Sequence, residues 1–309
     1  MLGPMSSDSP LVSILIPTHK RPDYLSLALA SARAQTYENL EIIISDNSGN
    51  DDSRAAIAGA LAEDPRIVYL PQVGGLATEN WRNAAGRARG EYISWLMDDD
   101  LYAPNKVERM LHYFRSYPTV SLVTSFRQLI DANGAPLAPL AGTQRLFEAD
   151  TVLAGTSMAE HILRAGMNLI GEPTTAMYRS ADVGAGWGRF CNKSYLVLSD
   201  LSTWLELMHG RPCVYIPEAL SSFRLHGGQD QRRNGLALRA NLEWLQLLLD
   251  GHENGRFFQD KNEFREILAA KFSVLMPHLV TQRDVLREND FDVEAVLALT
   301  RRAMRLLLQ

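Results

Sequence analysis

Apolar and polar residues alternate in blocks along the first 130 residues, and the blocks have the lengths of strands and helices. Short β-branched, apolar runs indicate buried strands, and longer segments with helical spacing of apolar positions lie between them. The predicted strands are 11–18, 40–46, 66–70, 91–96 and 119–130, and the predicted helices are 22–36, 54–64, 77–90 and 104–117. This alternation predicts βαβ units and an open, doubly wound α/β fold with a mainly parallel sheet.

The second half of the chain has a less regular pattern, and after residue 235 it becomes almost entirely helical. The predicted elements before that point are helices at 156–166 and 199–210, strands at 174–179 and 213–217, and a loop at 221–235. The predicted organisation is a disordered leader (1–10), an α/β domain (11–234, with halves 11–130 and 131–234) and a helical C-terminal region (235–309).

Composition narrows the class of protein. The 309 residues are 46% hydrophobic and carry a net charge of −5, which argues against broad nucleic-acid binding. The two cysteines have no metal-ligand spacing and suggest a reducing compartment. No apolar run approaches the roughly 20 residues that span a bilayer, and the first residues lack the features of a signal peptide. We therefore expect a cytoplasmic protein.

Polar clusters follow three of the predicted strands. "PTHKR" follows the first strand, "SDNSGNDD" the second and "MDDD" the fourth. Ligands of open α/β sheets bind outside the carboxyl ends of the strands, so these clusters predict a single site at one edge of the sheet.

The three adjacent aspartates, Asp98, Asp99 and Asp100, are the strongest chemical signal. Neighbouring carboxylates repel one another unless a cation compensates their charge. Mg²⁺ and Mn²⁺ accept carboxylate oxygens and usually keep substrate phosphates among their ligands. The motif alone leaves a second interpretation open, a solvated turn that caps the helix after Pro104.

"VSILIPTHKRPDYLSLALASARAQTYENLEIIISDNSGNDDS" followed by "GEYISWLMDDDLYAPNKVERM" resembles the inverting, nucleotide-sugar-dependent glycosyltransferases of family 2, which have a GT-A fold. The resemblance extends over about residues 11–230 and lies in the order and spacing of the segments. It implies a GT-A domain with a C-terminal helical extension and a nucleotide-sugar donor.

The resemblance places the nucleotide at the ends of the first two strands. Asp46 would contact the base, since a carboxylate can accept from the N3–H of uracil or thymine. Pro17 and Thr18 would line the base and ribose, and Asn80 and Asn83 would face the nucleotide. A turn-capping role for Asp46 and helix packing for the two asparagines remain open alternatives.

For the metal, Mn²⁺ or Mg²⁺, the resemblance implies Asp98 as a ribose or metal-shell contact and Asp99 as the main ligand. Asp100 would be a second ligand or a helix cap, and His226 a further metal or diphosphate ligand. Met97 occupies the place where the family usually has its first aspartate, which leaves the roles of the three aspartates open.

The general base implied by the resemblance is Asp200, at the start of the helix in "YLVLSDLSTWLELMHGRP", where Ser199 replaces a family glutamate. A plain N-cap is the alternative for both residues, and Glu172 is the second candidate base. Three arginines are candidates to bind the diphosphate: Arg224, Arg232 and Arg233.

The C-terminal segment 292–309 has apolar residues at helical spacing, with Arg301, Arg302 and Arg305 off that stripe. Three environments stay open for it: an anionic membrane surface, a second subunit in a homodimer, and the chain's own domain.

The resemblance implies a metal-dependent, inverting glycosyltransferase of polysaccharide biosynthesis. The donor would be a nucleotide-diphosphate sugar, with UDP- or dTDP-sugars favoured, and the acceptor a glycan, a lipid-linked or a small-molecule hydroxyl. A sugar nucleotidyltransferase is disfavoured, because "PTHKRPD" lacks the glycines of a phosphate loop. A non-catalytic nucleotide-sugar-binding or scaffolding protein remains the alternative, since Met97 and Ser199 stand where acids are expected.

Overall fold

The computed structural model describes residues 9–72, 75, 77–183, 186–228, 235–282, 284, 286 and 291–309. The chain forms two compact units that interleave in sequence. The first unit contains residues 1–153, 168–184 and 211–226, and the second contains residues 154–167, 185–210 and 227–309. The predicted domain boundaries at residues 130 and 234 stay predictions.

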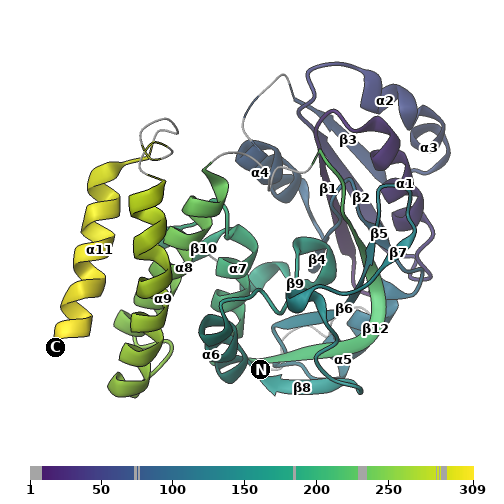
Figure 1. Ribbon diagram of the computed structural model, residues 1–309. Helices are drawn as coiled ribbons and strands as arrows, with labels where there is room; N and C mark the ends of the chain where they lie inside the picture. The colour runs from purple at the N-terminus through teal and green to yellow at the C-terminus, as the bar shows by residue number, and fades with distance from the viewer. Residues whose placement is uncertain are drawn as a thin grey trace. The chain divides into compact units, whose positions relative to one another are not determined.

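A central sheet forms the body of the first unit, with strand order β3-β2-β1-β4-β9-β6-β12-β5 (Figure 1). Strands β1 to β4 are parallel, as are β6 and β12, whereas β9 and β5 pair antiparallel with their neighbours. The α/β fold predicted from the sequence is confirmed. The strands are β1 Val12–Thr18, β2 Leu40–Asp46, β3 Ile67–Pro71, β4 Tyr92–Trp95, β5 Leu101–Tyr102, β6 Leu122–Ile130, β7 Pro136–Leu137, β8 Thr151–Ala154, β9 Met177–Arg179 and β12 Pro212–Arg224.

Helices cover both faces of this sheet. Alternate side chains of a strand point to opposite faces. The even-numbered apolar residues of β1 and β2 pack into one core with helices α1 (Pro22–Arg33) and α5 (Lys106–Ser116). Helix α4 (Ala77–Arg87) packs on β1 and β2 and brings Trp81 to 4.6 Å from the ring of Trp95. The carboxyl ends of β1, β2 and β4 thus share one edge.

Several predicted elements differ from the structure. The strand expected at 174–179 begins as a 3-10 helix, Pro173–Thr175, and only Met177–Arg179 forms a strand. The helix expected at 54–64 is two short helices, α2 (Asp52–Ala56) and α3 (Ala58–Glu63), separated at Ile57, whose side chain is buried. The loop expected from residue 221 begins later, because β12 continues to Arg224. Pairing with β6 over most of its length, across two register irregularities, holds this polar segment in the sheet.

The second unit is mostly helical. Helices α8 and α9 run side by side, and α11 packs on α9 (Figure 1). Its elements are α6 Gly155–Ala165, β10 Arg189–Phe190, β11 Lys193–Ser194, α7 Ser199–Met208, α8 Leu236–Glu253, α9 Lys261–Thr281 and α11 Val293–Leu308. The buried carboxylate of Asp250 joins them, since it accepts from Lys193, Tyr195 and Arg302 at 2.6 Å each. No described helix combines the length and the apolar character needed to cross a membrane.

Candidate functional site

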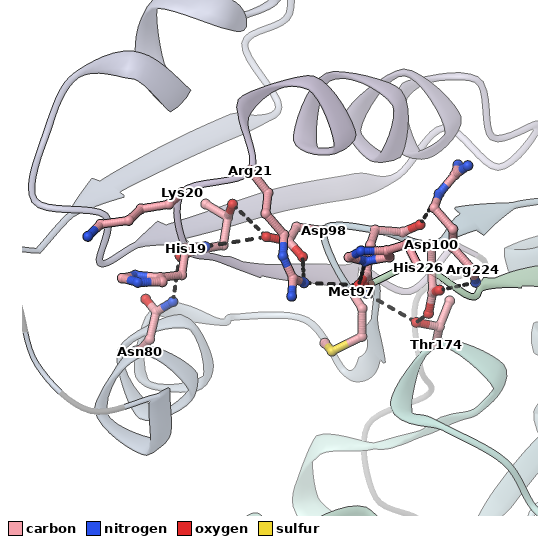
Figure 2. A network of polar contacts seen from close by, with 12 residues as sticks. His19, Lys20, Arg21, Asn80, Met97, Asp98, Asp100, Thr174, Arg224 and His226 are labelled. Carbon is pink, nitrogen blue, oxygen red and sulfur yellow. Dashed lines mark hydrogen bonds and ion pairs between the residues drawn. The ribbon is translucent and has the colours of Figure 1, made fainter. Parts of the chain in front are cut away.

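The predicted cluster at the strand ends exists in the first unit (Figure 2). Thr18 closes β1 and lies beside Asp46 at the end of β2 in the parallel register. β4 is the neighbour of β1 on the other side, and the chain reaches Asp98, Asp99 and Asp100 shortly after it ends at Trp95. All three aspartates are buried.

Asp98 is held by the end of β1. Its Oδ2 accepts from the Thr18 hydroxyl at 2.8 Å and from the His19 backbone N–H at 3.3 Å. Its Oδ1 accepts from Arg21 Nη1 at 3.1 Å. Burial raises the pKa of the Asp98 carboxyl to about 6, the Asp99 charge adds to the rise, and Arg21 and Thr18 oppose it.

Asp99 meets two cationic or ionisable partners at one oxygen. Its Oδ2 lies 2.9 Å from His226 Nε2 and accepts from Arg21 Nη1, also at 2.9 Å. His226 follows β12 and packs against the ring of Tyr24 on α1, with ring centroids 4.9 Å apart. The structure therefore brings together Asp99 and His226, two of the predicted metal ligands, although 127 positions separate them in the chain.

Asp100 has a different environment. Its Oδ2 accepts from the Thr174 hydroxyl at 2.5 Å and its Oδ1 from the Arg224 backbone N–H at 3.0 Å. Burial, together with the charge of Asp99, raises the pKa of Asp100 well above its usual value, and these two hydrogen bonds oppose the rise. The alternative that Asp100 caps the following helix is wrong, because α5 begins at Lys106 and has Asn105 at its N-cap position.

Arg224 is a structural residue, which corrects its candidacy as a diphosphate clamp. Its side chain is buried, and Nε donates to the backbone oxygen of Asp99 at 2.7 Å. Nη1 donates to the backbone oxygens of Asp131 and Ala132 at 3.1 Å. A guanidinium engaged in this way fixes the loop of the aspartates. The other two candidates, Arg232 and Arg233, lie outside the described residues.

Asp46 is buried and fixed at both oxygens. Oδ1 accepts from the Ser48 backbone N–H at 2.8 Å, and Oδ2 accepts from the Tyr69 hydroxyl at 2.6 Å. The first contact is the turn-stabilising bond that the sequence left open as an alternative. The two bonds orient the carboxylate beside Thr18 at the same sheet edge, and Pro17 is buried one residue earlier in β1.

Asn80 and Asn83 project from α4 toward the same strands. Asn80 Nδ2 donates to the Thr18 backbone oxygen at 3.1 Å and lies 3.3 Å from Asn47 Oδ1. Asn83 Nδ2 donates to the Ser45 hydroxyl at 2.9 Å. Both asparagines thus tie α4 to the ends of β1 and β2, which is the packing role that the sequence left open.

Asp200 belongs to the second unit. It lies in the first turn of α7, with Leu198 at the N-cap position and no side-chain cap bond there. The alternative that Ser199 or Asp200 caps this helix is therefore wrong. The buried carboxylate of Glu243 on α8 accepts from the backbone N–H groups of Leu196, Val197 and Leu198 at 2.7–3.0 Å and fixes the segment that enters α7.

Sequence reasoning missed two residues of the cluster. Arg21 lies in "PTHKR", a segment whose sequence indicates only a polar strand end, and no local signal indicates its contact with the aspartates. Thr174 bridges the aspartate loop, since its hydroxyl also accepts from the Met97 backbone N–H at 3.1 Å. Glu172, the second candidate base, pairs with Arg127 at 2.6 Å.

The chemistry of the donor atoms fits a divalent cation only in part. A carboxylate oxygen of Asp99 and the imidazole nitrogen of His226 converge, and both atom types bind Mn²⁺. Among the described residues, no group of three or more His, Cys, Asp or Glu side chains is arranged to hold a metal ion. A cation at Asp99 would therefore need further oxygen ligands, such as those of a diphosphate.

Curated relatives carry the same kind of domain. The chain is 28% identical over 231 residues to an uncharacterized glycosyltransferase of Rickettsia felis, covering 74% of this chain and 36% of the relative. It is 26% identical over 224 residues to a putative teichuronic acid biosynthesis glycosyltransferase, TuaG, of Bacillus subtilis, covering 72% and 81%. The chain spans only 19–36% of the length of the first five curated relatives that it matches.

Solved structures share the fold. TarS of S. aureus in complex with UDP aligns with a TM-score of 0.59 at 14% identity, covering 92% of this chain and 76% of that chain. A mannosyltransferase of Pyrobaculum calidifontis in complex with GDP-Man and Mn²⁺ also aligns with a TM-score of 0.59 at 14% identity, covering 99% and 83%.

A family model described as glycosyl transferase family 2 matches residues 13–152, the segment that contains Thr18, Asp46 and the three aspartates. The fold is that of the GT-A glycosyltransferases. Residues 13–152 are therefore similar in sequence to glycosyl transferase family 2.

Proposed function

We propose that this chain transfers a sugar from a nucleotide-diphosphate donor to an acceptor hydroxyl, with inversion at the anomeric carbon and with the help of Mn²⁺ or Mg²⁺. The single observation that carries the proposal is the convergence of Thr18, Asp98, Asp99 and His226 at the carboxyl ends of the strands. This edge is where open α/β sheets bind their ligands.

The nucleoside would bind at the ends of β1 and β2. Asp46, oriented by Tyr69 and Ser48, would accept from the N3–H of a uracil or thymine ring, while Pro17 and Thr18 line the base and ribose. Asn80 and Asn83 would keep α4 beside the nucleotide. The resemblance to the family favours UDP- and dTDP-sugars as donors, and the similar solved structures contain UDP in one case and GDP-Man in another.

The diphosphate would lie over Asp98, Asp99 and His226. A divalent cation bound there supplies positive charge that stabilises the departing nucleoside diphosphate. Asp99 and His226 would hold it, and Asp98 would contact the ribose or the metal's shell. Both oxygens of Asp100 accept hydrogen bonds, so this residue would hold the aspartate loop in place. To serve as a second metal ligand, Asp100 would have to give up the hydrogen bond from Thr174.

Asp200 would be the general base. It would take the proton of the acceptor hydroxyl as that oxygen attacks the anomeric carbon and the bond to the diphosphate breaks on the opposite face. Glu172 is the second candidate, and its carboxylate pairs with Arg127 at 2.6 Å.

The acceptor would be a glycan, a lipid-linked glycan or a small molecule. The likeness to TuaG of B. subtilis, a putative teichuronic acid biosynthesis glycosyltransferase, supports a role in polysaccharide biosynthesis. Helix α11 exposes Val293, Leu297, Met304 and Leu308 beside Arg301 and Arg305. A peripheral membrane contact and a homodimer contact would both use this surface. Flotation with anionic vesicles tests the first, and light scattering the second.

The test begins with ligand binding. Thermal denaturation of the full chain with UDP, dTDP or GDP, each with Mn²⁺ or with EDTA, identifies the base and the metal requirement, because a ligand of the native state raises Tm. Asp99→Asn is expected to abolish the metal-dependent part of the shift. Asp52→Asn, at an exposed position in α2, is the matched control and should keep it.

Turnover is tested by slow donor hydrolysis without acceptor. We expect hydrolysis that EDTA stops, that Asp99→Asn and Asp200→Asn each reduce at least about 100-fold, and that releases the inverted anomer in NMR spectra. Nucleotide binding without any hydrolysis, by the wild-type chain and with a broad acceptor panel, would favour the non-catalytic binder instead. Met97 and Ser199, where the family usually has acids, are the observation that supports this second candidate.

A further inference from the structure

Arg21 contacts both of the first two aspartates. Nη1 lies 3.1 Å from Asp98 Oδ1 and 2.9 Å from Asp99 Oδ2, and Figure 2 shows the side chain reaching the aspartate loop from the start of α1. The side chain is 24% exposed, whereas the two carboxylates are 7% and 8% exposed. The guanidinium therefore lies at the mouth of the cluster, with the carboxylates behind it.

The backbone aims Arg21 at this position. The preceding residue, Lys20, has φ of +53°, in the left-handed region that non-glycine residues adopt at a cost. Its N–H donates to the Ser48 hydroxyl at 2.7 Å, which holds the turn. Pro22 then begins α1 with a fixed φ. Because a strained residue precedes Arg21 and a proline follows it, the backbone restricts Arg21 to a position from which its side chain reaches the aspartates.

The same oxygen is the one proposed for the metal. Asp99 Oδ2 receives Arg21 Nη1 and lies beside His226 Nε2, both at 2.9 Å. A divalent cation bound to Asp99 would need a lone pair of Oδ2 and would lie close to that oxygen. A guanidinium at hydrogen-bond distance from the same oxygen would repel the cation. The arginine and the cation are thus alternative counter-charges for one carboxylate pair.

We propose that Arg21 is the resident counter-cation of Asp98 and Asp99 in the metal-free protein and competes with the divalent cation for Asp99. This inference rests on the proposed metal site. Binding of the cation requires the guanidinium to leave Asp99 Oδ2, so Arg21 weakens the affinity for metal while it balances part of the negative charge of Asp98 and Asp99.

The experiment measures metal binding rather than turnover. Mn²⁺ is titrated into the full chain without donor, and the free ion is followed by its EPR signal. Arg21→Met, which keeps the length but not the charge, should bind Mn²⁺ at least about tenfold more tightly than wild type. Arg21→Lys should stay within about threefold of wild type, because it keeps a positive charge.

Two further variants locate the effect. Arg33→Met removes an arginine at the end of α1 that pairs with Glu63 and Asp64 instead, and this variant should bind Mn²⁺ like wild type. Arg21→Met combined with Asp99→Asn should lose the gain. Equal or weaker Mn²⁺ binding by a folded Arg21→Met variant, or a gain that survives Asp99→Asn, would overturn the inference.

A measurement on the wild-type chain covers the case in which Arg21→Met does not fold. With ¹⁵N-arginine labelling, Mg²⁺ titration should shift the Nε–H signal of Arg21, assigned through Arg21→Lys. An unmoved signal at saturating Mg²⁺ would overturn the competition. Failure of the proposed function has a separate signature, donor hydrolysis that persists in EDTA or is absent altogether.

Discussion

Thr18 donates its hydroxyl hydrogen to Oδ2 of Asp98 across 2.8 Å, although 80 positions separate the two residues in the chain. Both side chains are buried. The bond joins the end of β1 to the loop after β4, and it stabilises a carboxylate whose pKa is raised by burial and by the neighbouring charge of Asp99. It thus holds together the two segments that would bracket the ribose and the diphosphate.

Thr18→Val is expected to lower the free energy of unfolding by about 1–3 kcal/mol. Valine has nearly the shape of threonine but no hydroxyl, so the buried carboxylate of Asp98 loses a hydrogen-bond donor. Urea denaturation followed by circular dichroism measures this change. Thr36→Val is the matched control, since Thr36 donates to Glu108 at an exposed position, and its effect should stay within about 0.5 kcal/mol. Equal stability of Thr18→Val and wild type would show that the bond contributes nothing.

Thr174→Val is expected to disturb the aspartate loop more than a surface change would. The hydroxyl of Thr174 contacts both Asp100 and the Met97 backbone, so the variant loses one buried and one partly buried hydrogen bond. Donor hydrolysis should fall about 10–100-fold, as when a group that orients metal ligands is removed. Thr174→Ser keeps the hydroxyl and should retain most of the rate; an equal loss in both variants would contradict a role for the hydroxyl.

The Asp64–Arg66 pair predicts a pH dependence of stability away from the site. Hydrogen bonds from Arg66 lower the pKa of Asp64 from 3.8 to about 2, against the opposing effect of burial. Because the folded-state pKa is lowered, the pair stabilises the fold above pH 4, and this contribution is lost as pH falls from about 4 to about 2. A double-mutant cycle of Asp64→Asn and Arg66→Met measures it by urea denaturation.

The coupling energy from this cycle should be favourable at pH 6 and shrink toward zero near pH 2, where Asp64 becomes protonated. A coupling that is constant over this range would show that the charge of Asp64 does not stabilise the fold. Asp64 Oδ1 also accepts from the Arg66 backbone N–H at 3.1 Å, a bond that Arg66→Met leaves in place.

Glu243→Gln tests the support of the proposed base. Glu243 accepts from three successive backbone N–H groups before α7, and a glutamine would present an amide N–H₂ to some of them. We expect a loss of about 1–3 kcal/mol in stability and a lower kcat for hydrolysis, with the Kd for UDP unchanged. Gln246→Ala, three residues later on α8, is the control; reduced UDP affinity in Glu243→Gln would point to a wider disturbance.

The alternation of strands and helices in the first unit and the position of the polar clusters at the strand ends could both be predicted from the sequence. Both follow from local rules: the period of apolar residues sets the type of element, and parallel strands bring their carboxyl ends to one edge. Thr18, Asp46 and Asp98 could therefore be placed together from the sequence alone, because each lies at or just after the end of a predicted strand.

The partners that these groups contact, by contrast, became known only from the folded chain. Arg21 reaches Asp98 and Asp99 because Lys20 turns the chain, and Thr174 meets Asp100 because a distant segment returns beside β4. Arg224 looked like a phosphate-binding residue but is buried, since β12 continues through it in the sheet. Such contacts cannot be predicted from residue type and spacing, because the contacts depend on strand order and on where each loop returns to the sheet.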